Sequence, residues 1–299
     1  MKPCIFTPTV TILNDDDRID IEKNLVVAEH LVECGIDGIL ALGSTGEFTW
    51  LDQEDKKRYF TELSHALSGR AELLLGVGGL HYRDTVELAN FSQGLDAVRG
   101  VMVISEFYFN MSQDDFYNYY AYMAEQIKGR VYVYNYPART GNSISADTIA
   151  KLARKYSNIV GLKDSVGTFE HTKEVFEKVL DVRPDFEIFS GFDNQFGDNV
   201  ALGGAGGIGA LSNIVPRLWS SWVKANREGD AERMAEGARR IEALMPIYSL
   251  ESNPQKILKE ILKALGFPIS THCHFPYDNL KADSLERALK LVAENDGEL

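Results

Sequence analysis

A lysine at the end of an apolar run is the residue of this chain with the clearest chemical potential. Lys163 follows Ile159-Val160-Gly161-Leu162, a run that predicts a buried strand. A protonated amine is costly to take out of water, but a neutral amine is a nucleophile that can form a Schiff base with a ketone. The alternative is an ordinary strand-end lysine that keeps its ammonium group in solvent. Taken alone, Lys163 favours that alternative, so its partners decide the interpretation.

Two adjacent hydroxyl groups lie between glycines earlier in the chain, in Gly43-Ser44-Thr45-Gly46-Glu47. Ser44 and Thr45 offer side-chain and backbone donors, which suit a small anion such as a carboxylate. The alternative is a short Ser/Thr loop that caps the next helix. The motif is weak by itself, because such loops are common.

A tyrosine and an arginine follow another apolar run, in Tyr134-Asn135-Tyr136-Pro137-Ala138-Arg139-Thr140-Gly141. The phenol of Tyr134 can both donate and accept a hydrogen bond, so it can relay protons. The planar guanidinium of Arg139 fits a carboxylate with two hydrogen bonds. A core tyrosine and a solvent-exposed arginine are the alternatives. Together with the lysine and the two hydroxyls, these groups match a 2-keto acid and a second acidic or hydroxylated partner.

Strands and helices alternate along the chain and must position these residues. Short apolar runs predict strands, and the longer runs between them have apolar residues at helical spacing. The predicted strands are Cys4–Thr7, Gly38–Leu42, Leu73–Val77, Val101–Ile104, Val131–Tyr134, Ile159–Lys163, Glu187–Ser190 and Gly207–Ala210. The predicted helices are Ile21–Cys34, Gln53–Leu67, Asp84–Ser92, Asp114–Ile127, Ser145–Tyr156, Glu170–Leu180 and Pro216–Arg227. This alternation predicts an α/β fold, a (β/α)8 TIM barrel.

An open, doubly wound sheet is the alternative fold, but no Gly-x-Gly-x-x-Gly fingerprint follows the first strand. In a barrel, catalytic residues come from the carboxyl ends of the strands and the loops that follow, which is where Lys163 and Tyr134 lie. We expect residues 1–228 to form the barrel and residues 229–299 to form a C-terminal helical extension packed on it. Its predicted helices are Ala231–Leu244, Gln255–Leu265 and Ala282–Ala293.

Composition and charge argue against several classes of protein. The 299 residues are 44% hydrophobic, enough for a large core, and carry a net charge of −13. An acidic chain without a basic stripe argues against nucleic-acid binding and suits a cytoplasmic protein. No run has the length of a membrane span, and the N-terminus lacks the apolar core of a signal peptide. The unclustered cysteines and the adjacent His272, Cys273 and His274 lack the spacing of a metal site.

Three motifs resemble, in order and spacing, the dihydrodipicolinate synthase / N-acetylneuraminate lyase family of class I, pyruvate-dependent aldolases. They are Gly-Ser-Thr-Gly-Glu at 43–47, Tyr-Asn-x-Pro-x-Arg-Thr-Gly at 134–141 and Gly-Leu-Lys-Asp at 161–164. Ser190-Gly191-Phe192-Asp193 and the glycine-rich segment 203–208 also match, and the resemblance runs from Phe6 to about Asn213 at least. The stretch from Pro268 to His272 is similar to the 2-keto-3-deoxygluconate aldolase branch.

The resemblance implies a catalytic or substrate-binding role for four of these residues. Lys163 would form the Schiff base with pyruvate, and Tyr134 would relay protons beside it. Ser44 and Thr45 would bind the pyruvate carboxylate, with Thr45 also in the proton relay. Members of the family need no metal or organic cofactor, because the iminium is the electron sink.

The resemblance also implies contributions from two further residues and a particular assembly. Tyr108, in Phe107-Tyr108-Phe109, would complete the proton relay from a neighbouring subunit. Ile208 would line the pyruvate pocket through its backbone. The family is usually a homotetramer built as a dimer of dimers.

The second substrate depends on which branch the chain resembles. Arg139 matches the arginine that binds the semialdehyde carboxylate in dihydrodipicolinate synthases, and this alone favours condensation of pyruvate with L-aspartate semialdehyde, as in 4-hydroxy-tetrahydrodipicolinate synthase. The general similarity favours the alternative, a 2-keto-3-deoxy-sugar-acid aldolase. Asn194 and Ala210 replace the acidic and hydroxyl residues of N-acetylneuraminate lyases, so that activity fits less well. Phe48-Thr49-Trp50 departs from the lysine-inhibited synthases, which weakens the expectation of feedback inhibition by lysine.

A barrel that binds a 2-keto acid without catalysis is a hypothesis from another class. The intact set of lysine, tyrosine and threonine argues against it.

Overall fold

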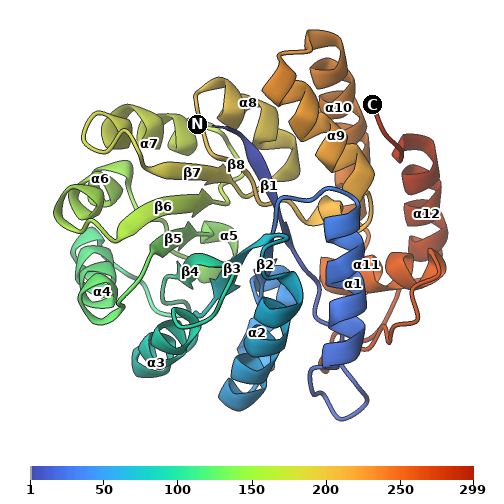
Figure 1. Ribbon diagram of the computed structural model, residues 1–299, viewed down its shortest axis with the longest axis horizontal. Coiled ribbons are helices and arrows are strands. Elements are labelled where there is room, and N and C mark those ends of the chain that lie inside the picture. Colours follow the sequence, from blue (N-terminus) through green and yellow to red (C-terminus); the bar gives the residue numbers. More distant parts are fainter. Residues whose placement is uncertain (1) are drawn as a thin grey trace.

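Eight parallel strands close into a barrel in the computed structural model, which describes residues 2–299. Each strand pairs with the next, and the last pairs with the first. The strands are β1 (Cys4–Pro8), β2 (Gly38–Ala41), β3 (Glu72–Gly76), β4 (Val98–Ile104), β5 (Val131–Asn135), β6 (Ile159–Asp164), β7 (Glu187–Ser190) and β8 (Gly206–Gly207). Their buried aliphatic side chains form the core, and the predicted (β/α)8 barrel is confirmed (Figure 1).

Helices cover the outside of the barrel (Figure 1). They are α1 (Ile21–Glu33), α2 (Gln53–Leu67), α3 (Tyr82–Ser92), α4 (Gln113–Gln126), α6 (Ala146–Lys155), α7 (Glu170–Leu180), α8 (Phe196–Ala201) and α9 (Pro216–Glu228). Several begin at a side-chain cap: Asp20, Ser112 and Ser145 each accept a hydrogen bond from a backbone N–H of the first turn, which satisfies donors that the helix leaves free.

The structure differs from the predicted elements in three places. β8 is Gly206–Gly207, whereas Ala210, predicted as strand, begins a 3-10 turn at Ala210–Asn213. The short helices α5 (Pro137–Thr140) and α8 were not predicted. Elements of four and six residues are too short for a hydrophobic period to show.

The last seventy residues form further helices beside α9 and α1 (Figure 1, orange and red). They are α10 (Ala231–Leu244), the 3-10 turn η5 (Met245–Ser249), α11 (Pro254–Ala264) and α12 (Ser284–Asn295). α10 packs on α9, and α12 packs on α10 and α11. α11 also contacts η1 (Ser44–Gly46), the loop after β2. We keep the division into a barrel at 1–228 and an extension at 229–299 as a proposal.

The amino-terminal end of the barrel is closed by a polar network. The Tyr132 hydroxyl donates to Glu187 Oε2 at 2.6 Å, and Arg99 and Arg130 form ion pairs with the same carboxylate. Because these charges are paired with one another, the cost of holding them away from water is partly offset. The carboxyl ends of the strands are the end that carries the large cleft described below.

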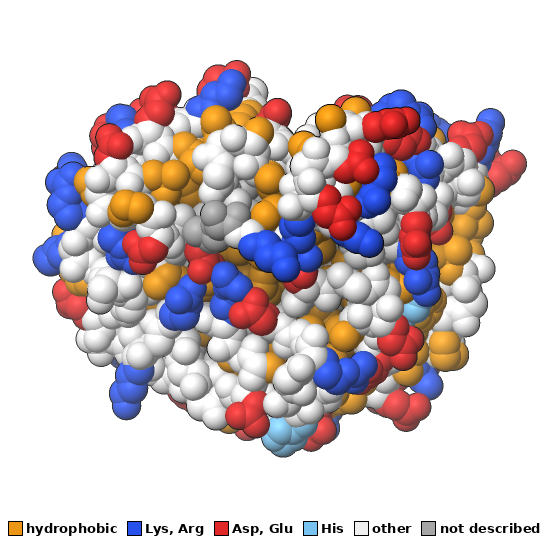
Figure 2. Space-filling model, turned by 45° about the horizontal axis from the view of Figure 1, so that its top comes forward, with side chains coloured by type: hydrophobic (Ala, Val, Ile, Leu, Met, Phe, Trp, Pro, Cys, Tyr) orange, Lys and Arg blue, Asp and Glu red, His pale blue; other side chains and the backbone are white. Residues whose placement is uncertain are grey.

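The outer surface has mixed charge. On the face drawn in Figure 2, acidic and basic side chains are interspersed, with small apolar areas between them. Within residues 2–299 no helix has the length and apolar character needed to cross a membrane.

Candidate active site

A cleft of about 580 Å³ opens at the carboxyl ends of the strands. Residues from six strands or the loops after them line it, and the extension adds one wall. The barrel contributes Pro8, Ser44, Thr45, Tyr134, Tyr136, Arg139, Lys163, Ser165, Gly191, Phe192, Asp193, Asn194, Ile208 and Ala210. The extension contributes Glu242, Met245, Pro246, Tyr248, Ser249, Pro254 and Gln255. Except for Tyr108, every predicted site residue therefore lies in one cavity.

Lys163 sits at the carboxyl end of β6 and is 4% exposed. Burial lowers the pKa of its amine from 10.5 to about 8, although Tyr136 and Asp193 act in the opposite direction. Desolvation dominates because the low dielectric of the cleft disfavours the ammonium form. The lowered pKa makes a larger fraction of the amine neutral, and therefore nucleophilic, near neutral pH.

Tyr134 lies beside the lysine. The two residues are paired neighbours on β5 and β6, and Lys163 Nζ is 4.4 Å from the centre of the Tyr134 ring. The Tyr134 hydroxyl is 3.3 Å from Ser44 Oγ. Burial raises the pKa of the phenol, so it stays protonated, while Ser44 and Ser165 act in the opposite direction. A protonated phenol between an amine and a hydroxyl can pass protons in either direction.

The loop after β2 presents Ser44 and Thr45 to the cleft. The chain leaves the strand through Gly43 and turns into the 3-10 helix Ser44–Gly46. Glu47 then takes a left-handed conformation with φ of 57°, which is strained for a residue with a side chain. Ser44 and Thr45 both line the cleft that also contains Lys163.

Arg139 and Ile208 both line the cleft but differ in exposure. Arg139 lies on the short α5 and is exposed at the rim, where no ion pair involves it within residues 2–299. Its guanidinium is therefore available to an anion that enters. Ile208 is buried after β8, and its backbone N–H donates to Ser190 O at 2.9 Å.

Tyr108 does not line the cleft. Its side chain is 86% exposed, and its backbone has φ of 81°. Phe109, which packs edge-on against it, is 75% exposed. The protomer alone does not bring Tyr108 to Tyr134 or Thr45.

Two residues that sequence reasoning missed complete the site. Asp193 is buried in the cleft, and Tyr248 from the extension donates to its Oδ2 at 2.6 Å. Leu211 N–H donates to its Oδ1 at 3.1 Å. Burial raises the pKa of Asp193 to about 6, while these hydrogen bonds and Lys163 act in the opposite direction. Asp193 belongs to the matched segment Ser190-Gly191-Phe192-Asp193, but the sequence indicated no role for it. The sequence around Tyr248 does not indicate that this residue contacts Asp193.

Fold and site together define a barrel enzyme with a buried amine nucleophile at the carboxyl ends of its strands. The model of the "Dihydrodipicolinate synthetase family" matches residues 2–295. The chain belongs to this family. It is accordingly a class I, pyruvate-dependent lyase or aldolase.

Several relatives resemble the chain over most of its length. A "Putative 2-dehydro-3-deoxy-D-gluconate aldolase YagE" of Escherichia coli is 30% identical over 90% of this chain and 88% of its own. A 4-hydroxy-tetrahydrodipicolinate synthase of Kosmotoga olearia is 32% identical over 85% and 86%.

Solved structures agree with this assignment. The crystal structure of YagE in complex with pyruvate superposes with a TM-score of 0.93 at 28% identity, covering 98% of both chains. A dihydrodipicolinate synthase from Thermotoga maritima superposes with a TM-score of 0.92 at 25% identity, covering 99% of both.

Proposed function

We propose that Lys163 forms a Schiff base with pyruvate. The neutral amine attacks the ketone, and water leaves with a proton supplied through Tyr134. The cationic iminium then draws electrons from the methyl group, which loses a proton to give an enamine. The enamine carbon attacks an aldehyde, and hydrolysis frees the product and the lysine. The reverse sequence cleaves a 2-keto acid into pyruvate and an aldehyde.

One observation carries this proposal: the lysine amine is buried, and its pKa falls to about 8. Two neighbouring groups support it. Ser44 and Thr45 line the same cleft as Lys163, and their hydroxyls can donate hydrogen bonds to the carboxylate of a bound 2-keto acid. Ile208 lines the same part of the cleft.

We propose as the second substrate a carboxylated aldehyde, with L-aspartate semialdehyde as the leading candidate. Arg139 supports this assignment, because an exposed guanidinium at the rim can bind a carboxylate with two hydrogen bonds. The reaction is then the 4-hydroxy-tetrahydrodipicolinate synthase type, and the relative from Kosmotoga olearia carries that name.

A second candidate is cleavage of a 2-keto-3-deoxy sugar acid. The names of YagE and of a probable 2-dehydro-3-deoxy-D-pentonate aldolase, YjhH, both of Escherichia coli, favour it. The outer wall of the cleft supports it too, since Asn194, Glu242 and Ser249 offer donors and acceptors to a hydroxylated chain. N-acetylneuraminate lyase activity fits less well, because Asn194 and Ala210 replace the acidic and hydroxyl residues of that branch. A barrel that binds a 2-keto acid without catalysis would not explain the buried amine of Lys163.

We further propose a homotetramer in which Tyr108 of the partner subunit completes the proton relay. A second cavity, of about 210 Å³, adjoins the cleft, because Ser44, Arg139 and Gln255 line both. Aromatic side chains such as Phe48 and Phe107 line it, and it suits a tyrosine ring. Exposed apolar side chains occur on the segments after β3 and β4 and on the helices α3 and α4, and such a set is typical of an interface. They are Leu80, Tyr82, Tyr108, Phe109 and Tyr122.

The remaining expectations are part of the same proposal. The enzyme works in the cytoplasm, needs no metal or organic cofactor, and has neither nucleic-acid nor membrane partners. The iminium supplies the electron sink that a cofactor would otherwise provide.

Trapping with borohydride tests the Schiff base. Wild-type protein incubated with pyruvate and borohydride should gain the mass of one reduced pyruvate adduct, mapped to Lys163, and Lys163→Ala should gain none. A wild-type protein without an adduct would refute the enzyme mechanism. The second substrate follows from comparing aspartate semialdehyde consumption with pyruvate release from 2-keto-3-deoxygluconate. Whichever reaction has the higher kcat/KM identifies the branch.

A further inference from the structure

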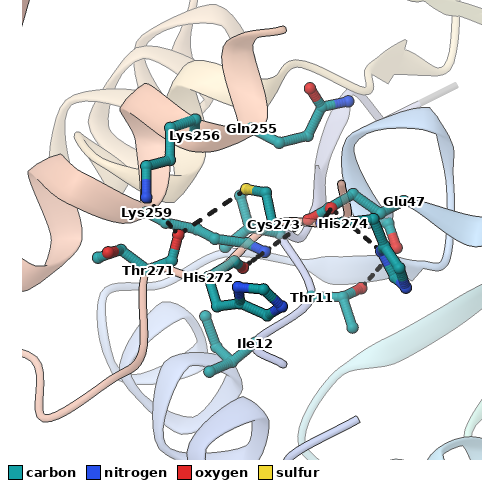
Figure 3. A network of polar contacts seen from close by, with 12 residues as sticks. Thr11, Ile12, Glu47, Gln255, Lys256, Lys259, Thr271, His272, Cys273 and His274 are labelled. Atoms are coloured by element: carbon teal, nitrogen blue, oxygen red, sulfur yellow. Dashed lines mark hydrogen bonds and ion pairs between the residues drawn. The ribbon is translucent and has the colours of Figure 1, made fainter. Parts of the chain in front are cut away.

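A buried ion pair joins the extension to the loop after β2. Lys259 of α11 is fully buried, and its Nζ lies 2.5 Å from Glu47 Oε1 and 2.7 Å from the His272 carbonyl oxygen (Figure 3). Glu47 is 5% exposed and directly follows Ser44-Thr45-Gly46. The pair therefore links α11 to the end of the segment that carries the two cleft hydroxyls.

The second oxygen of Glu47 is held by the segment before α12. The His274 backbone N–H donates to Oε2 at 3.3 Å, and His274 Nδ1 lies 3.5 Å from the same atom. The His274 ring stacks on Trp50, with centres 5.4 Å apart. Burial acts to raise the pKa of Glu47, but the contacts with His274 and Lys259 outweigh it and lower the pKa. Glu47 is therefore ionised, and both its oxygens are engaged by the extension.

Two further hydrogen bonds hold the same loop by its backbone. Gln255, one turn before Lys259 on α11, donates from Nε2 to the Ser44 carbonyl oxygen at 2.9 Å. From the barrel side, the Thr11 hydroxyl donates to the Gly46 carbonyl oxygen at 2.8 Å. Ser44 and Gly46 are thus fixed from two directions, and Glu47 anchors the turn that follows.

Stability alone does not account for this arrangement. Taking two charges out of water costs several kcal/mol per ion, and the attraction within a buried pair often only offsets that cost. Left-handed backbone at Glu47 adds strain. Such a pair is better understood as fixing one geometry where small displacements matter.

We propose that Lys259 and Glu47 are positioning residues that hold Ser44 and Thr45 in place for the carboxylate of pyruvate. The barrel holds this loop through Thr11, and α11 of the extension fixes it from the other side through the ion pair, assisted by Gln255. This inference rests on the proposed Schiff base at Lys163.

Replacing the lysine by a methionine tests the proposal. Lys259→Met keeps an unbranched side chain that is only one heavy atom shorter, but removes the charge and both hydrogen bonds. The pyruvate concentration that gives half-maximal borohydride-trapped adduct should rise about tenfold, since a misplacement of about 1 Å can cost up to about 100-fold. The limiting rate at saturating pyruvate should change far less, because Lys163 and Tyr134 do not contact the pair.

Lys256→Met is the matched control. Lys256 is also a largely buried lysine of α11, and it forms ion pairs with Glu260 and Asp278 and a hydrogen bond to Thr271 O. None of these partners belongs to the loop after β2. Its half-saturating pyruvate concentration should equal that of the wild type.

A double variant guards against misfolding, because Lys259→Met leaves a buried carboxylate without its cation. In Glu47→Gln/Lys259→Met neither of the two positions carries a buried charge, and the oxygen of the introduced amide can still accept a hydrogen bond from the His274 N–H. The half-saturating concentration should fall part of the way back, to about threefold above wild type. Three results would overturn the proposal. The first is a half-saturating concentration in Lys259→Met equal to that of the wild type. The second is a value in the double variant no lower than in Lys259→Met, and the third is a rise in Lys256→Met as large as in Lys259→Met. Absence of adduct in the wild type would instead refute the Schiff base itself.

Discussion

Lys163 and Tyr134 are direct neighbours across β5 and β6, and the lysine amine lies 4.4 Å from the centre of the tyrosine ring. The face of an aromatic ring attracts a cation, so the ring favours both the ammonium form and the iminium that replaces it. Burial acts against the ammonium form and lowers the pKa to about 8. In the proposed reaction, the neutral amine would attack the ketone, and the same ring would then stabilise the cationic iminium.

The first prediction concerns the pH dependence of adduct formation. Only the neutral amine attacks, so the rate constant for trapping pyruvate at Lys163 should rise with pH and level off above its pKa of about 8. Rapid-quench borohydride trapping at saturating pyruvate measures this. A midpoint near the ordinary lysine value of 10.5 would contradict the effect of burial.

The second prediction concerns the carboxylate that faces the amine. Asp193 raises the pKa of Lys163 by its charge. Asp193→Asn keeps the size of the side chain and removes that charge, so the midpoint of the same profile should move to lower pH. Tyr248→Phe is the companion variant, because it removes only the hydrogen bond to Asp193 Oδ2 and leaves the charge in place. Its midpoint should move less than that of Asp193→Asn.

The third prediction separates proton transfer from binding. Tyr134→Phe retains the ring beneath the amine but loses the hydroxyl that contacts Ser44. Turnover should fall by about 100-fold, the usual contribution of a positioned acid or base, while the half-saturating pyruvate concentration changes little. If both quantities change together, Tyr134 binds pyruvate and does not relay protons.

Sequence reasoning located the parts of the site that local motifs carry. Lys163, Tyr134 and the Ser44-Thr45 pair each follow a strand, and strand periodicity with barrel topology places them at one end of the fold. The partners that the extension supplies were not predictable, because Tyr248, Gln255 and Lys259 reach the barrel across more than 50 residues of intervening chain. A helical period shows which face is buried and not which distant group a buried lysine meets. Tyr108 was singled out only through the resemblance, and its contact with a partner subunit stays a proposal.

The fourth prediction concerns Arg139 and the second substrate. Arg139→Ala should lower kcat/KM for a carboxylated aldehyde by about tenfold, which corresponds to about 1.4 kcal/mol and is modest because the side chain is exposed at the rim. Kinetics with L-aspartate semialdehyde and with uncharged glyceraldehyde measure the difference. Unchanged kinetics with the semialdehyde would remove Arg139 from the substrate site and favour the sugar-acid branch.

The fifth prediction concerns a half-buried histidine beside the carboxyl end of β6. His171 Nδ1 lies 2.7 Å from Asp164 Oδ2, and its Nε2 lies 2.8 Å from the Ile144 carbonyl oxygen. Both partners only accept hydrogen bonds, so both ring nitrogens donate and the imidazole is protonated. Burial acts to lower the pKa of His171, but the hydrogen bond and charge of Asp164 outweigh it and raise the pKa above 6.5.

The raised pKa of His171 makes its contribution to the stability of the fold larger at acidic than at alkaline pH. A folded-state pKa above the unfolded value stabilises the fold fully below about pH 6.5, and the contribution is lost as pH rises through the folded-state pKa. His171→Gln should therefore lower the free energy of unfolding by about 2 kcal/mol at mildly acidic pH, with a smaller deficit in alkaline solution. Urea unfolding of both proteins across this range measures the difference. A deficit independent of pH would show that His171 stabilises β6 by packing and not by its charge.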